Sequence, residues 1–246
     1  MLIVAYFNKH HLGALLATLL GVPFATYGQV ETSGIQLGMS RVIFNETTKN
    51  AVVTLPLENP DNKPYLIQSV VRNETMQKSS AFIVTPPLFR IEGGQKGQVQ
   101  IIKGDTVFAS DRESLHFLCV KGIPSQEKRT GVPQNASSAL MVAINTCIKI
   151  LYRPASLAES RVEVVANQLV WGRQGNQLTV KNTTPLYQHF SSITLDGVPI
   201  ENAGYVAPFS STHYTVQTHS PGNRVIWRVI DEFGGAGASH SSQLTL

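Results

Sequence analysis

Two cysteines and a nearby lysine are the residues of this 246-residue chain whose types and spacing allow chemistry. Cys119 and Cys147 are its only cysteines, and Lys149 follows the second one closely. Two thiols can form a structural disulfide, or they can exchange electrons at a redox site. No C-x-x-C spacing is present to support thiol exchange, so an ordinary disulfide is the favoured interpretation.

Other reactive side chains form no recognisable catalytic or metal-binding pattern. No H-E-x-x-H or comparable ligand spacing occurs, and lone histidines on strands are usually structural or solvated. A G-x-S-x-G nucleophile elbow is also missing, and the glycine run 234–237 opens no helix, which predicts a turn. We therefore expect that the protein is not an enzyme and that it binds neither a metal nor a cofactor. The histidines concerned are His116, His189, His213, His219 and His240.

The N-terminal residues carry an export pattern. Lys9 precedes an apolar run over 12–25, and small residues follow, which predicts a secretory signal peptide over residues 1–28. An exported protein meets oxidants that can join its two cysteines. The formal net charge of +4 is too small an excess to indicate nucleic-acid binding.

One long alternating stretch holds more apolar surface than a single sheet pairing requires. Residues 138–152 predict a strand with Leu140, Val142 and Ile144 on one face and Lys149 on the other. Such a strand suits a binding partner as well as the core of its own domain. The alternative is that these apolar residues are half-buried edge positions covered by the protein itself.

The elements that must position these residues are short strands separated by Gly, Pro, Asn and Asp. Residues 29–153 predict an immunoglobulin-like sandwich, and residues 154–246 predict a second, smaller β-sandwich. The segment 122–137 contains two prolines and predicts a long mobile loop before the long strand. No helical period of useful length appears, so the fold class is all-β. The expected strands are 35–44, 51–58, 65–72, 82–85, 98–102, 115–121, 138–152, 162–164, 169–172, 177–181, 189–195, 213–217, 224–230 and 239–246.

Several segments of the first domain carry a family resemblance. Residues 108–124 read FASDRESLHFLCVKGIP, residues 82–91 read FIVTPPLFRI, and residues 148–154 read IKILYRP. These blocks, with SRVIF at 40–44, closely resemble the signature of the PapD-like periplasmic chaperones that assemble bacterial fimbriae. The paired cysteines and long loop resemble the long-FG-loop branch of that family. The second domain is similar mainly through 229–234.

The resemblance implies two immunoglobulin-like sandwiches in a bent, boomerang-like arrangement, located in the periplasm. It also implies a chaperone that caps fimbrial or fibrillar adhesin subunits by donor-strand complementation, without ATP, and delivers them to an outer-membrane usher. Leu140, Val142 and Ile144 would be the lent face of the donor strand. Because an exposed apolar edge is an aggregation hazard, we also expect self-association of the free protein.

The resemblance further assigns roles to five charged residues. Arg41 and Lys149 resemble paired cations that anchor the C-terminal carboxylate of the subunit through charge-assisted hydrogen bonds. From the residues alone, each is more readily a solvated strand residue or a member of an internal ion pair. Glu113, Arg153 and Asp231 resemble a charge cluster that sets the angle between the domains. Each of these could equally be an unpaired surface residue, since exposed ion pairs contribute little stability.

Two other function classes compete with the chaperone. An exported immunoglobulin-like structural subunit or adhesin would show a detachable N-terminal donor segment and one incomplete sandwich. This chain instead predicts two domains and an internal donor strand. A secreted hydrolase with β-sandwich modules would need a convergent catalytic set, which the sequence does not offer.

Overall fold

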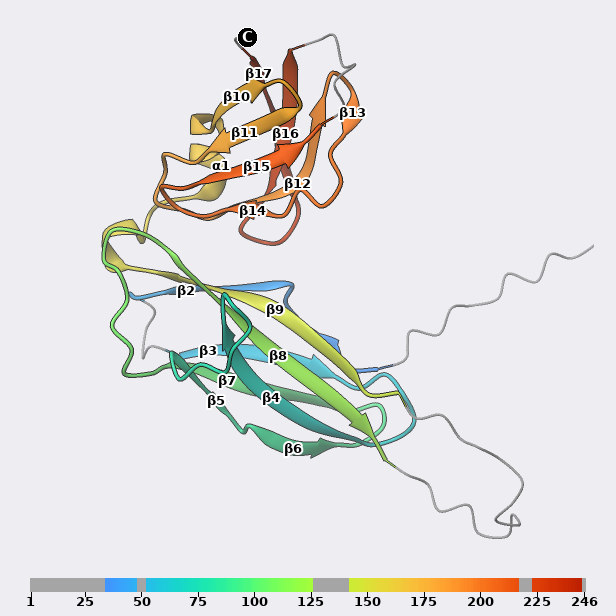
Figure 1. Ribbon diagram of the computed structural model, residues 1–246. Helices are drawn as coiled ribbons and strands as arrows, with labels where there is room; N and C mark the ends of the chain where they lie inside the picture. Colours follow the sequence, from blue (N-terminus) through green and yellow to red (C-terminus); the bar gives the residue numbers. More distant parts are fainter. Residues whose placement is uncertain (1–33, 48–51, 126–141, 217–222, 245–246) are drawn as a thin grey trace, which may run out of the picture. The chain divides into compact units, whose positions relative to one another are not determined.

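The computed structural model describes residues 34–47, 52–125, 142–216 and 223–244, and the regular secondary structure of these residues is almost entirely strand (Figure 1). They form two β-sandwiches, each with its own hydrophobic core, which confirms the predicted all-β class. The predicted signal peptide over 1–28 and donor residue Leu140 lie outside the described residues. Within those residues, no helix is long and apolar enough to cross a membrane.

The first sandwich consists of a four-stranded and a five-stranded sheet. The four-stranded sheet has the order β1-β3-β7-β5, and the five-stranded sheet has the order β2-β9-β8-β4-β6. The strands are β1 (Gln36–Leu37), β2 (Arg41–Asn45), β3 (Val52–Glu58), β4 (Tyr65–Asn73), β5 (Phe82–Thr85), β6 (Leu88–Ile91), β7 (Lys96–Lys103), β8 (Ser114–Pro124) and β9 (Ile144–Arg153).

Alternation along the strands builds the first core. On β9, Ile148, Ile150 and Tyr152 face inward and are buried, as are Val42 and Phe44 on the neighbouring strand β2. The intervening residues therefore point away from this core, because successive side chains on a strand alternate between faces. This places Arg41 and Lys149 together on the outer face of the five-stranded sheet.

A disulfide joins the two central strands of that sheet. Cys119 on β8 and Cys147 on β9 are direct partners in the antiparallel register, and their sulfurs are bonded. The disulfide predicted from the sequence is thus confirmed. Both cysteines stand on the outer face, between the inward-facing residues Leu118 and Val120 on one strand and Ile148 on the other.

Removing this disulfide is expected to destabilise the first sandwich. The bridge closes a loop with a sequence separation of 28, for which chain entropy gives about 3–4 kcal/mol. We expect Cys119→Ala with Cys147→Ala to lower the free energy of unfolding in urea by about that amount. Wild-type protein unfolded with a reducing agent should match the double variant. A difference below about 1 kcal/mol would contradict the chain-entropy account.

The second sandwich begins after Pro154 and has a separate core around Trp171, Leu178, Ile193 and Trp227. One sheet has the order β10-β11-β15, and the other has the order β13-β12-β16-β17 with β14 also paired to β12. Its elements are η2 (Ala155–Leu157), α1 (Val162–Val165), η3 (Ala166–Gln168), β10 (Val170–Gln174), β11 (Gln177–Lys181), β12 (Gln188–Leu195), β13 (Val198–Pro199), β14 (Tyr205–Val206), β15 (Ser211–Thr215), β16 (Arg224–Ile230) and β17 (Ala236–Gln243).

The prediction of a strand at 162–164 is wrong, because these residues form the short helix α1. A Val-rich segment favours a strand locally, but tertiary contacts decide its conformation here. The Trp227 indole donates to the carbonyl of Ala166 at 3.1 Å, and the Glu163 carboxylate accepts from the backbone of Glu232 at 3.1 Å. The predicted domain boundary at Pro154 falls between β9 and η2 and stays a prediction.

The first two residues of the glycine run, Gly234 and Gly235, lie in a turn as predicted, whereas Ala236 and Gly237 begin strand β17. Gly234 has a φ of +92°, which L side chains rarely adopt, and a Cβ there would collide with the Ser40 hydroxyl. A residue other than glycine at position 234 would therefore be strained by this φ and would clash with Ser40, just before β2.

Candidate functional site

Strand β9 is paired on both sides over only half of its length. It pairs with β8 from Ile144 to Tyr152, but β2 pairs with it only from Lys149 onward (Figure 1). Within the described part of the chain, residues 144–148 therefore have a free edge on the side where β2 would continue. An unpaired edge presents backbone N–H and C=O groups to any strand that can align with it.

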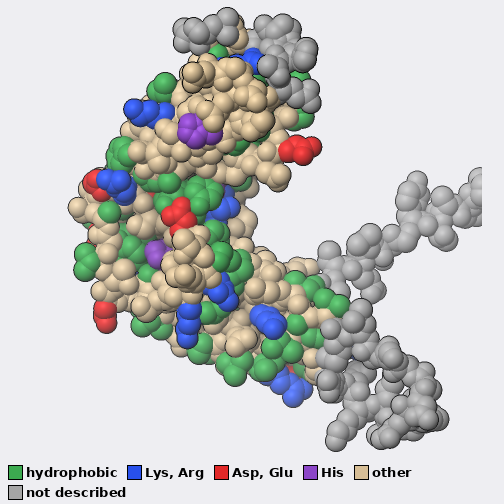
Figure 2. Space-filling view, in the orientation of Figure 1, with side chains coloured by type: hydrophobic (Ala, Val, Ile, Leu, Met, Phe, Trp, Pro, Cys, Tyr) green, Lys and Arg blue, Asp and Glu red, His purple; other side chains and the backbone are tan. Residues whose placement is uncertain are grey.

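Apolar side chains stand at this open half of β9. Ile144 shares the inward face with Ile148 and Ile150, yet Ile144 is 46% exposed and Val142 just before the strand is 62% exposed. Exposed apolar side chains that continue the inward face of a strand mark a surface suited to binding another protein. Figure 2 shows hydrophobic side chains among the Lys and Arg side chains on one face of this sandwich. The predicted self-association through such an edge stays a prediction.

Arg41 and Lys149 meet at the point where the open half of β9 ends. They are direct Cα partners in the parallel pairing of β2 with β9. Both side chains are partly buried, and burial lowers the pKa of each, with Arg41 adding repulsion at Lys149. Arg41 Nη1 donates to the Ile230 carbonyl at 3.4 Å, while its buried Nε has no partner in the described structure. An anion placed here would receive donors from both side chains and relieve their repulsion.

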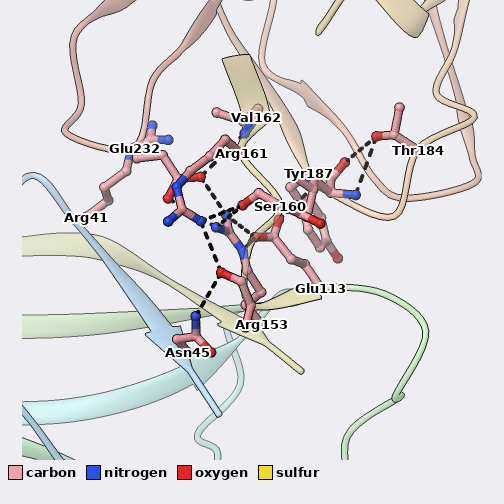
Figure 3. A network of polar contacts seen from close by, with 12 residues as sticks. Arg41, Asn45, Glu113, Arg153, Ser160, Arg161, Val162, Thr184, Tyr187 and Glu232 are labelled. Carbon is pink, nitrogen blue, oxygen red and sulfur yellow. Dashed lines mark hydrogen bonds and ion pairs between the residues drawn. The ribbon is translucent and has the colours of Figure 1, made fainter. Parts of the chain in front are cut away.

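Arg153 lies between two carboxylates, those of Glu113 and Glu232. Arg153 is 2% exposed, and its Nε and Nη2 donate to Glu113 Oε1 at 2.9 and 2.8 Å (Figure 3). Its Nη2 and Nη1 also donate to Glu232 Oε1 and Oε2 at 2.8 and 3.1 Å. The backbone of Tyr187 donates to Glu113 Oε2 at 2.8 Å. Arg153 on the first sandwich thus bonds to carboxylates of both sandwiches.

The role of Asp231 in setting the angle between the domains stays a prediction, and the carboxylate of this turn that bonds to Arg153 is that of Glu232. Asp231 Oδ1 instead accepts from the backbone of Phe233 at 2.9 Å and of Gly235 at 2.7 Å, which shapes the turn after β16. The sequence offers two adjacent carboxylates where β16 ends, and strand alternation no longer applies beyond Ile230. No sequence pattern distinguishes between them.

Two further contacts near the cluster were not predicted. Glu74, after β4, accepts from the hydroxyls of Tyr205 at 2.7 Å and Tyr187 at 3.2 Å. Burial, followed by the hydrogen bond that Tyr205 donates to Glu74, raises the pKa of Tyr205 to about 12. The rings of these tyrosines also flank His189, which is 2% exposed and was treated from the sequence as an ordinary structural residue.

Two family models match the described chain. The model described as "Pili and flagellar-assembly chaperone, PapD N-terminal domain" covers residues 34–158, and "Pili assembly chaperone PapD, C-terminal domain" covers residues 164–241. The chain belongs to the PapD-like family of pilus-assembly chaperones. The resemblance noted in four short segments of the first domain and one of the second is thereby confirmed for both domains.

Named relatives of this PapD-like chain are chaperones. It is 33% identical to chaperone protein PsaB of Yersinia pestis over 228 residues, which are 85% of this chain and 83% of that protein. It is 35% identical to chaperone protein AfaB of Escherichia coli over 198 residues, covering 77% of this chain and 79% of that protein. Each match is long enough to include residues of both sandwiches.

Solved structures agree with this relationship. A chain in the complex of the Salmonella enterica SafA pilin with the SafB chaperone matches with a TM-score of 0.77 and 34% identity. That match covers 86% of this chain and 97% of the other. The E. coli chaperone DraB matches with a TM-score of 0.75 and 33% identity over 86% of this chain and 97% of its own.

Proposed function

We propose that this PapD-like protein is a periplasmic chaperone that binds fimbrial or fibrillar subunits by lending them strand β9. The observation that carries the proposal is the half-open edge of β9, which starts at Ile144 directly after the exposed Val142 and ends at Arg41 and Lys149. Relatives that are named chaperones, one of them from a complex with a pilin, support the same activity. The comparisons give no support to the alternative of a structural subunit or adhesin.

The direction of the client strand follows from the position of the cations. If the C-terminal carboxylate of the client lies at Arg41 and Lys149, the rest of its last strand extends back along residues 144–148. That strand then runs parallel to β9, as β2 does, and ends where β2 begins. From Ile144 to Lys149, the rise of a strand allows about 16 Å of shared ladder. Backbone hydrogen bonds supply affinity, and the anchor sets the register.

The second part of the proposal concerns where the chaperone acts and what it serves. The periplasm supplies no ATP. Binding of the subunit must therefore be driven by strand addition and by burial of apolar side chains alone. Delivery of the capped subunit to an outer-membrane usher completes the proposed cycle. Membership of the long-FG-loop branch is likewise a proposal, supported by the disulfide between β8 and β9 and by the length of the segment between those strands.

Co-expression with periplasmic subunits of the same operon, followed by affinity purification of the chaperone, tests the proposal. We expect a subunit to co-purify with the wild-type chain, and Val142→Asp to reduce its retention by about tenfold or more. The reason is that a carboxylate would enter an apolar groove of the subunit. Val170→Asp is a matched control, since Val170 is similarly exposed, at 55%, on the second sandwich.

Two outcomes would count against the proposal. Failure of the wild-type chain to retain any of the operon's subunits would remove the chaperone assignment. Equal retention by the Val142→Asp and Val170→Asp variants would instead show that the open half of β9 is not the lent strand.

A further inference from the structure

His189 is a buried polar residue that no contact within the described structure explains. It lies on β12, is 2% exposed, and both of its ring nitrogens lack a hydrogen-bond partner within the described residues. Its ring stands 5.2 Å from that of Tyr205 and 6.0 Å from that of Tyr187, measured between centroids. Because burying an unpaired donor or acceptor costs free energy, such a group calls for a missing partner.

The strand register places His189 beside the two cations of the anchor. The pairing of β12 with β16 ends at Phe190 and Val229, so His189 and Ile230 are the next residues along these two antiparallel strands. The carbonyl of Ile230 accepts from Arg41 Nη1, which brings the Arg41 guanidinium to the same point. Lys149 is in turn the direct strand partner of Arg41. Three nitrogen-bearing side chains from β2, β9 and β12 therefore converge.

The electrostatic surroundings keep the imidazole neutral. Burial, with smaller contributions from the charges of Lys149 and Arg41, lowers the pKa of His189 to about 3. A neutral imidazole carries one N–H donor and one acceptor nitrogen, and its tautomer adapts to the partner it meets. It can therefore add a donor beside Arg41 and Lys149 without adding a third positive charge.

We propose that His189 is the third donor of the anchor and hydrogen-bonds the C-terminal carboxylate of the client subunit. This inference rests on the proposed function and names one more residue of the same site. Arg41 and Lys149 supply the charge that attracts the carboxylate, and His189 fixes its orientation from the second sandwich. The N–H of the neutral His189 ring and the unpaired Nε of Arg41 are then two donors available to the same anion.

The test uses a peptide copy of the last fifteen residues of the subunit recovered by co-expression, made once as the free acid and once as the C-terminal amide. Dissociation constants are measured for wild-type chaperone, His189→Leu and His189→Gln. We expect His189→Leu to weaken binding of the free acid by about tenfold, the loss of one hydrogen bond to a charged group. Binding of the amide should change much less. His189→Gln, which keeps a donor, should restore most of the preference for the acid.

The comparison of acid with amide separates an anchoring role from a packing role. If His189 only fills space between two tyrosines, its variants will weaken both peptides equally, and that result would overturn the inference. Unchanged binding of both peptides by His189→Leu would overturn it as well. If His189→Leu behaves as wild type while Arg41→Ala with Lys149→Ala loses the free acid, the proposed function stands and only the role of His189 fails. If that double variant also binds normally, the anchor itself is wrong.

Discussion

Replacing Arg41 and Lys149 together by alanine is expected to abolish recovery of a soluble subunit complex. Each cation can give the client carboxylate a charge-assisted hydrogen bond of about 1.5–3 kcal/mol. Losing both should weaken binding by about a hundredfold or more. Without this anchor the register of the added strand is also unspecified, because backbone pairing alone permits slippage.

The chaperone itself should remain folded in this double variant. Burial lowers the pKa of both cations, and Arg41 repels Lys149, so neither charge is favourably placed in the free protein. Far-ultraviolet circular dichroism and the urea midpoint should therefore stay close to wild type. A matched control is Lys121→Ala with Arg228→Ala, which removes two cations from other surface positions. Undiminished co-purification with the Arg41 and Lys149 double variant would exclude the anchoring role.

Replacing Arg153 by methionine is expected to lower the free energy of unfolding by about 3–5 kcal/mol near neutral pH. The change leaves Glu113, which is 3% exposed, as a buried carboxylate without its cation. It also removes the hydrogen bonds that join Arg153 to Glu232 and to the Ser160 carbonyl (Figure 3). Urea denaturation followed by tryptophan fluorescence measures the loss.

The same variant should be less destabilised at acidic pH. Burial raises the pKa of Glu113, and the charge of Arg153 opposes that rise, so removing Arg153 raises this pKa further. An acid whose folded pKa exceeds its unfolded value favours the folded state when protonated, and this advantage is lost as the pH rises through the folded pKa. The deficit of Arg153→Met relative to wild type should therefore shrink between pH 8 and pH 5.

Glu113→Gln combined with Arg153→Met provides the control for this interpretation. With no carboxyl at position 113, the pH-dependent part of the deficit should disappear, and the double variant should be more stable than Arg153→Met alone at pH 8. A pH-independent deficit in Arg153→Met would show that lost packing, rather than an uncompensated buried charge, dominates. If Arg153→Met lowers the free energy of unfolding by less than about 1 kcal/mol, the ion pair of Arg153 with Glu113 contributes no more than a solvent-exposed pair.

Strand alternation made much of the first sandwich predictable. Ile148, Ile150 and Tyr152 alternate with Cys147, Lys149 and Leu151, so the order of residues alone indicates which side chains share a face. The disulfide could be predicted because only two cysteines exist. The edge strand β6 and the helix α1 could not, since the conformation of each depends on its tertiary neighbours.

The features of the candidate site likewise fall into those that the sequence indicates and those that only the tertiary structure shows. By itself the sequence indicated the all-β class and the disulfide, because these depend on residue type and local spacing, whereas Arg41, Lys149, Glu113 and Arg153 were singled out only through the family resemblance. Only the tertiary structure decided that Glu232 and not Asp231 pairs with Arg153, and that His189 is buried. Those facts depend on how strands far apart in the chain come together, and no periodicity within a single strand encodes that.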